Sequence, residues 1–208
     1  MGSQTSDDAA LLAAWRSGDS RAGSRLFDRH YARLARFFRN KVQDELYDLI
    51  QQTMLACLEQ GAAPREDERF AAFLLGVARN VLLHHYRTRA RKLDNIDFGV
   101  SAVADLYLGG TSVVARSERD RLLLEALRRL PVEQQILLEL YYWEELSATA
   151  LAALYEVPEG TIRTRLRTAR KRLEGTLPEL ARSMGAPLLD GEHNLEAWAR
   201  EVRALVDA

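Results

Sequence analysis

The chain has 208 residues, of which 29 are basic and 30 acidic, so that its formal net charge is -1. This balance and the hydrophobic content of 47% are ordinary for a globular protein of one or two domains, and the net charge does not indicate a nucleic-acid binder. No run of eighteen apolar residues occurs, and the N-terminus lacks the basic start and apolar stretch of a signal peptide. We therefore expect a cytoplasmic protein without membrane insertion.

Metal and catalytic sites are not predicted. The single cysteine, Cys57, excludes an internal disulfide and a multi-cysteine zinc site, and the four histidines lack metal-ligand spacing: His30, His84, His85 and His193. The sequence has no glycine-rich phosphate loop, no nucleophile elbow and no paired histidine and carboxylate. We expect neither catalytic residues nor a cofactor, and hence no enzyme.

Apolar spacing is helical almost throughout, and no alternating pattern indicates a sheet, so the fold class is all-α. The first domain, residues 1–92, is expected to be a helical bundle. Its predicted helices cover about 7–16, 20–40, 44–60 and 66–91. Residues 93–116 then lose periodicity and contain Asp94, Asp97 and Asp105, with no lysine or arginine before Arg116. This stretch is predicted to be an acidic, flexible linker between two small helical domains.

A second domain is predicted over residues 117–175. Helix resumes near Ser117, breaks at Pro131 and continues to Trp143. Ser147 is the expected N-cap of a short helix to Tyr155, and a turn at 157–160 precedes a basic helix over 161–173. The arrangement is typical of a helix-turn-helix. Residues 176–208 form a C-terminal extension, in which Leu195, Trp198 and Val202 predict an amphipathic helix.

The basic helix has two contrasting faces. Ile162, Leu166, Ala169 and Leu173 form an apolar stripe that is expected to pack on the preceding helix. The remaining surface is polar and cationic, and arginines there could recognise guanine edges in a major groove. The candidate duplex-binding residues are Arg163, Thr164, Arg165, Arg167, Thr168 and Lys171.

Two further surfaces are candidates for binding. In the helix from residue 66, Asn80, His84 and Arg87 lie beside an apolar face, and such a stripe can bind splayed bases, although a solvated polar surface fits it equally well. In the preceding helix, Asp48, Gln52 and Leu55 form an outward stripe that suggests a protein partner.

Four segments together resemble the extracytoplasmic-function (ECF) sigma factors of the sigma-70 family. They are DLIQQTM from Asp48, FLLGVARN from Phe73, Leu130-Pro131, and VPEGTIRTRL from Val157 continued by ARKRL from Ala169. The resemblance covers about residues 7 to 175 in the expected order, and it does not extend to the C-terminal tail.

This resemblance implies a role for each surface. The helix of Asp48, Gln51, Gln52 and Leu55 would dock on core RNA polymerase. A second group would capture unpaired bases of the minus-ten element, together with the loop at 61–69: Arg79, Asn80, His84 and Arg87. The basic helix, now including Thr161, would recognise the minus-thirty-five duplex. The partners would be core RNA polymerase, promoter DNA and an anti-sigma factor.

Four positions depart from the family pattern. Gln52 stands where an acid is common, Met54 where an aromatic is frequent, Thr168 where a base is common, and Glu156 at the usual glycine of the helix-turn-helix turn. A left-handed Glu156 would cost about 1–2 kcal/mol. Two alternatives remain open at this point: a helix-turn-helix regulator that acts on duplex DNA without joining polymerase, and a helical module that binds only protein.

Overall fold

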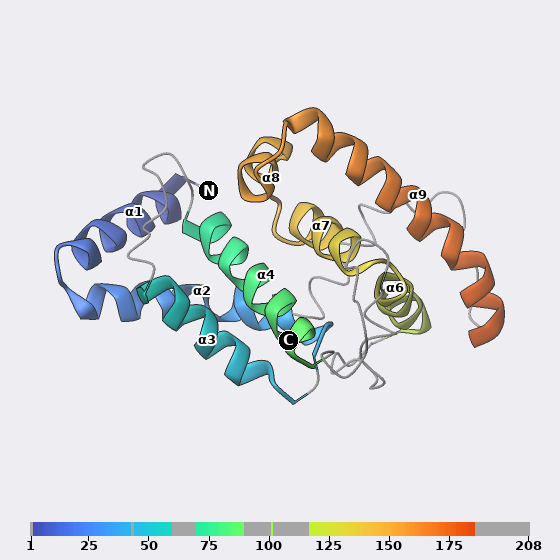
Figure 1. Cartoon of the computed structure of the whole chain (residues 1–208), viewed down its shortest axis with the longest axis horizontal. Coiled ribbons are helices and arrows are strands. Elements are labelled where there is room, and N and C mark those ends of the chain that lie inside the picture. The colour runs from blue at the N-terminus through green and yellow to red at the C-terminus, as the bar shows by residue number, and fades with distance from the viewer. Residues whose placement is uncertain (1, 43, 60–69, 90–100, 102–116, 186–208) are drawn as a thin grey trace.

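The computed structural model describes residues 2–42, 44–59, 70–89, 101 and 117–185, and within these ranges it is helical and contains no strand (Figure 1). Four helices belong to the N-terminal half, residues 2–89: α1 (Gly2–Arg16), α2 (Ser20–Arg39), α3 (Leu46–Glu59) and α4 (Phe70–Arg89). Four belong to the C-terminal half, residues 117–185: α6 (Glu118–Arg128), α7 (Val132–Tyr142), α8 (Ala148–Tyr155) and α9 (Glu159–Met184). The all-α class is confirmed.

Local capping explains where several helices begin. Asp19 precedes α2, and its carboxylate accepts hydrogen bonds from the backbone N–H groups of Arg21 and Ala22. Ser117 and Ser147 cap α6 and α8 in the same way. The sequence-based prediction that Ser147 begins a short helix is thus confirmed, and Pro131 directly precedes α7 as expected.

The N-terminal half is a bundle whose core lies between α2, α3 and α4. Leu26, Leu34 and Phe38 of α2 are buried together with Leu49 of α3 and Leu74 of α4. This burial follows from the apolar stripes of the three helices. The four helices expected within residues 1–92 are therefore present, with α4 beginning at Phe70 in the described part of the chain.

Helix α9 is longer than the sequence suggested. It was expected to end near Leu173, but it continues through Gly175 to Met184 and ends at Gly185, which has a positive φ of 64°. Leu177 and Leu180 are buried in a second apolar cluster with Leu123 of α6. The first part of the predicted C-terminal extension therefore completes the C-terminal half.

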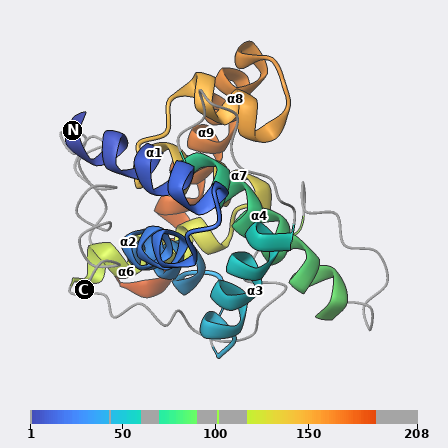
Figure 2. The same cartoon turned by 90° about the vertical axis from the view of Figure 1, so that its left-hand side faces the viewer.

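The two halves pack against each other. One continuous apolar cluster joins α2, α3 and α4 to Val132, Ile136 and Leu140 of α7 and to Leu151 of α8. In Figures 1 and 2, α4 and α7 lie near each other at the centre of the molecule. The loop at 61–69, all of the predicted linker except Ser101, and the predicted terminal helix at Leu195 lie outside the described residues. Ser101 accepts a hydrogen bond from the Val132 N–H through its carbonyl, at 3.0 Å.

Candidate nucleic-acid interface

Helices α8 and α9 form the predicted helix-turn-helix. The turn between them passes through Glu156, whose φ of 53° and ψ of 43° place it in the left-handed region. Its N–H donates to carbonyl groups at the end of α8. In α9, Ile162, Ala169 and Leu173 are buried and Leu166 is partly buried, which confirms the predicted apolar stripe.

The other surface of α9 faces solvent. Its exposed residues are Arg163, Thr164, Arg165, Arg167, Thr168 and Lys171, whereas Thr161 is half-buried. At the start of the helix Glu159 accepts hydrogen bonds from Arg163 Nε at 2.9 Å and from the Thr149 hydroxyl at 2.9 Å. The bond from Arg163 is the main reason why the pKa of Glu159 lies below its ordinary value. Arg163 thus has an acidic neighbour at the start of α9.

The candidate residues of α4 differ in their exposure to solvent. Asn80, His84 and Arg87 are exposed, in agreement with the predicted stripe. Arg79, in contrast, is half-buried and forms an ion pair with Glu133 of α7. Its guanidinium lies 4.6 Å from the ring centroid of Tyr155. It also donates to Asn80 Oδ1 at 3.2 Å. The C-terminal half therefore covers one of the four residues that were expected to meet unpaired bases.

Helix α3 presents the predicted outward stripe. Asp48, Gln51, Gln52 and Leu55 are all exposed, and the Leu55 side chain is unusually so for a leucine, at 48%. Tyr47 is 71% exposed and lies on the same surface, because residues four apart share one side of a helix. The sequence analysis missed Tyr47, although its spacing of four and eight residues from Gln51 and Leu55 was a sufficient signal.

The buried side of α3 is mostly apolar, and the hydroxyl of Thr53 there donates to the Leu49 carbonyl at 2.7 Å. This side includes Ile50, Thr53 and Cys57, and burial raises the pKa of the Cys57 thiol to about 12. This thiol therefore stays protonated and unreactive at neutral pH.

The sequence analysis also missed a set of ion pairs between the halves. Glu144 accepts hydrogen bonds from Nε of Arg33 and Nε of Arg36, both at 2.6 Å, and its own side chain is only 4% exposed. Lys41, at the end of α2, forms an ion pair with Glu139 of α7, and both side chains are buried. Burial lowers the pKa of Lys41 and raises that of Glu139, while their mutual attraction opposes both shifts.

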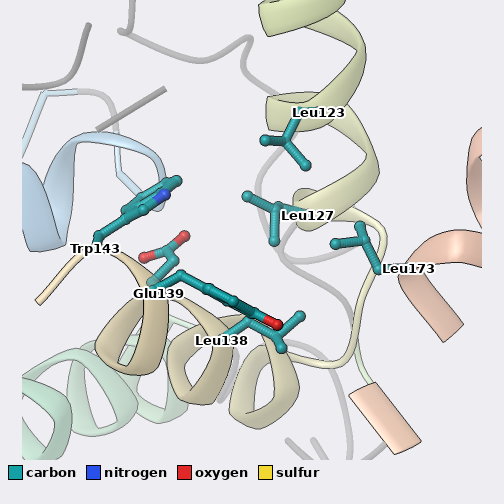
Figure 3. A pocket seen from close by; sticks show the side chains of 7 residues that line it. Leu123, Leu127, Leu138, Glu139, Trp143 and Leu173 are labelled. Atoms are coloured by element: carbon teal, nitrogen blue, oxygen red, sulfur yellow. The ribbon is translucent and has the colours of Figure 1, made fainter. Parts of the chain in front are cut away.

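A hollow in the C-terminal half is too small to be a ligand site. It lies between α6, α7 and α9, where Leu123, Leu127 and Leu173 face Glu139 and Trp143 (Figure 3). Its volume of about 10 Å³ leaves room for one water molecule at most. Among the described residues, no group of side chains could hold a metal ion, and no helix is long and apolar enough to cross a membrane.

Comparison with known proteins assigns a family to each half. Residues 26–92 match the model of Sigma-70 region 2, and residues 120–173 match that of Sigma-70, region 4. The ECF RNA polymerase sigma factor SigM of Mycobacterium tuberculosis is 30% identical over 169 residues, which cover 80% of this chain and 82% of SigM. The chain belongs to the ECF sigma factors. Members of this family are transcription initiation factors rather than enzymes.

Other relatives are consistent with this assignment. The ECF RNA polymerase sigma-E factor of Haemophilus influenzae is 24% identical over 183 residues, covering 83% of this sigma factor and 96% of the relative. Among solved structures, CnrH in complex with the cytosolic domain of CnrY has a TM-score of 0.60 and 22% identity, covering 83% of this chain and 98% of that one. The fold is therefore that of a sigma factor with two helical domains. Neither alternative that the sequence left open finds support in these matches.

Proposed function

We propose that this sigma factor binds core RNA polymerase, directs it to specific promoters and stabilises the opened DNA through two separate DNA-binding surfaces. The observation that carries the proposal is the order of the two family regions along the chain, each with an exposed candidate surface at the matching helix. Polymerase and DNA would meet this chain in the cytoplasm. An anti-sigma factor is a further expected partner, because the solved relative CnrH was captured with CnrY.

The outward surface of α3 is the proposed polymerase-binding site. Asp48, Gln51 and Gln52 supply polar contacts, and Leu55 with Tyr47 supplies apolar area that is otherwise left in water. Such an exposed pair surrounded by polar groups is typical of a protein-binding surface. Gln52 would contact polymerase without the charge that is common at this position.

Two helices would bind DNA in different states. On α4, Asn80, His84, Arg87 and, once it is uncovered, Arg79 would hold unpaired bases of the minus-ten element. Binding of single-stranded bases offsets an unstacking cost of a few kcal/mol and so favours the open promoter.

On α9, the cationic surface would recognise the minus-thirty-five duplex. Its residues are Thr161, Arg163, Thr164, Arg165, Arg167, Thr168 and Lys171. A helix of this composition fits the major groove, with arginines on base edges and phosphates. The polymerase itself carries out nucleotide chemistry, so the sigma factor needs no catalytic residue or cofactor.

The test is specific initiation in a purified system. Full-length protein is mixed with sigma-free core polymerase and a library of genomic promoter fragments, and transcripts are mapped. We expect discrete start sites that depend on the added protein. Failure to associate with core polymerase would contradict the proposal, whereas duplex binding without polymerase association would favour a conventional helix-turn-helix regulator.

A further inference from the structure

The first turn of α9 contains a small hydrogen-bonded network around one carboxylate. Glu159 is the first residue of the helix, and its Oε1 accepts two hydrogen bonds from Arg163, from Nε at 2.9 Å and from Nη2 at 2.5 Å. Its Oε2 accepts a hydrogen bond from the Thr149 hydroxyl at 2.9 Å. Thr149 belongs to α8, which lies against the start of α9 (Figure 1). Both helices of the helix-turn-helix therefore fix the direction of one arginine.

The contact with Glu159 uses only one edge of the Arg163 guanidinium. Arginine has five N–H donors, and the bonds to Glu159 occupy the N–H of Nε and one N–H of Nη2. The opposite edge, formed by Nη1 and Nη2, keeps the fork geometry that matches two acceptors side by side. In the major groove guanine is the base that presents two such acceptors, N7 and O6. An arginine held in this way is therefore suited to guanine.

Neither folding nor general affinity for DNA accounts for this network. The side chains of Arg163 and Glu159 are 73% and 36% exposed, and an exposed ion pair of this kind adds little stability. The carboxylate also opposes phosphate binding, because it neutralises part of the arginine charge. What Glu159 supplies is orientation, since an arginine that is already held loses less rotamer freedom when it binds.

Gly160, the next residue, indicates that a partner approaches this turn closely. A Cβ atom built there would meet no protein atom within 4 Å, and its φ lies outside the left-handed region. Neither packing nor backbone conformation requires glycine here, although glycine destabilises a helix relative to alanine. The missing side chain lets a duplex approach the first turn of α9, where a helix of this kind meets base edges.

We propose that Glu159 is a positioning residue that, held by Thr149, directs Arg163 to a single guanine of the minus-thirty-five duplex. This inference rests on the proposed function and names one base of the duplex together with the residues that select it. Without Glu159, Arg163 could turn to a phosphate, and phosphate contacts carry no sequence information. The carboxylate therefore exchanges general affinity for selectivity.

Selection from a randomised duplex tests the assignment. Core polymerase with the full chain is bound to promoter fragments whose upstream element is randomised, and the retained fragments are sequenced. We expect one position with a guanine preference that is lost in Arg163→Lys, which keeps the charge but not the fork. Glu159→Ala should reduce the preference at that same position about tenfold and leave the other positions unchanged.

Three further variants separate positioning from charge. Thr149→Val removes the hydroxyl that holds the carboxylate and should lower the guanine preference, though less than Glu159→Ala does. Thr149→Ser keeps the hydroxyl and should retain the preference. Glu174→Ala removes a carboxylate from an exposed position farther along α9 and should leave the preference intact. Thermal unfolding of each variant checks that the helix-turn-helix is still folded.

Binding to a scrambled duplex should change in the opposite direction. In Glu159→Ala, Arg163 can reach a phosphate, so the affinity of the full chain for scrambled duplex should rise. Its salt dependence should steepen by about one phosphate contact. The double variant of Glu159→Ala with Arg163→Ala should lose this gain, because it lacks the cation.

The outcomes separate the two proposals. Equal guanine preference in the unaltered protein and in Glu159→Ala, or an equal loss in Glu174→Ala, would overturn the positioning role and leave the proposed function standing. If the unaltered protein with core polymerase selects no upstream sequence, the proposed function is wrong and the positioning role falls with it.

Discussion

Helices α4 and α9 carry similar basic sequences but present them in opposite ways. On α9 the cations Arg165, Arg167 and Lys171 face solvent, whereas on α4 Arg79 is held by Glu133 and stacked near Tyr155. Both helices carry net positive charge, from three arginines without an acid on α4 and from seven cations against three acids on α9. The difference lies in what packs against them, because α4 faces the acidic side of α7 while the outer face of α9 meets no other described element.

The number of basic residues in a helix therefore does not tell how many of them are exposed for binding. The proposed duplex-binding residues Arg163, Arg165 and Arg167 of α9 are exposed in this structure, whereas Arg79, one of the proposed single-strand-binding residues of α4, is held by Glu133.

The largest expected effect comes from breaking the buried ion pair between Lys41 and Glu139. Lys41→Met leaves Glu139 buried without its cation and should lower the free energy of unfolding by about 3–5 kcal/mol. Adding Glu139→Leu should restore part of that loss, because an apolar pair avoids the desolvation, while the buried Gln135 amide loses the carboxylate to which it donates at 2.7 Å. Urea unfolding of the two single variants and the double variant measures this coupling.

The control for that cycle is the exposed pair of Arg129 and Glu125. Arg129→Met should cost no more than about 1 kcal/mol, because water already screens that pair. A Lys41→Met variant as stable as Arg129→Met would mean that the buried pair does not hold the halves together.

The next-largest effect is expected on the solvent-facing surface of α9. Arg167→Ala should weaken binding to the upstream duplex by about 1–3 kcal/mol, through loss of a base or phosphate contact. Arg163→Ala should fall at the lower end of that range, because Glu159 already neutralises part of its charge. Titration of the full chain with matched and scrambled promoter duplexes measures both. Arg129→Ala, which removes a cation from outside α9, should leave affinity unchanged.

A smaller effect is expected on α4. Asn80→Ala should weaken open-complex formation by about 1 kcal/mol, the usual value of one hydrogen bond, while core polymerase binds as before. Thymine reactivity at fixed polymerase concentration measures the open fraction, and co-migration with core polymerase measures association. Unchanged opening would remove Asn80 from the minus-ten surface.

Much of this structure could be predicted from patterns among residues close together in the sequence. The N-cap at Ser147 and the stripe of Ile162, Ala169 and Leu173 were predictable, because capping and helical period depend on neighbours within a few residues. The outward stripe of α3 was predictable for the same reason. The DNA and polymerase roles of these surfaces remain predictions.

The contacts that the sequence did not predict are long in range or depend on packing. Arg79 and Glu133 are 54 residues apart, and Lys41 and Glu139 are 98 apart, so no periodicity connects them. The basic helix was predicted to end at residue 173, yet burial of Leu177 and Leu180 against α6 outweighs the weak helix propensity of Gly175. Tertiary packing, rather than local sequence, determines both the ion pairs between the halves and the length of α9.

The smallest effect concerns the turn that sets α9 against α8. Glu156 has a left-handed backbone, which costs a residue with a side chain about 1–2 kcal/mol, and glycine removes that cost while losing more entropy on folding. Glu156→Gly should therefore raise the free energy of unfolding by roughly 0.5–1 kcal/mol without changing the exposed surface of α9. Glu174→Gly, within the regular part of α9, should instead lower it by about 1 kcal/mol. If both variants lose stability in urea unfolding, the backbone entropy that glycine loses on folding exceeds the left-handed strain at Glu156.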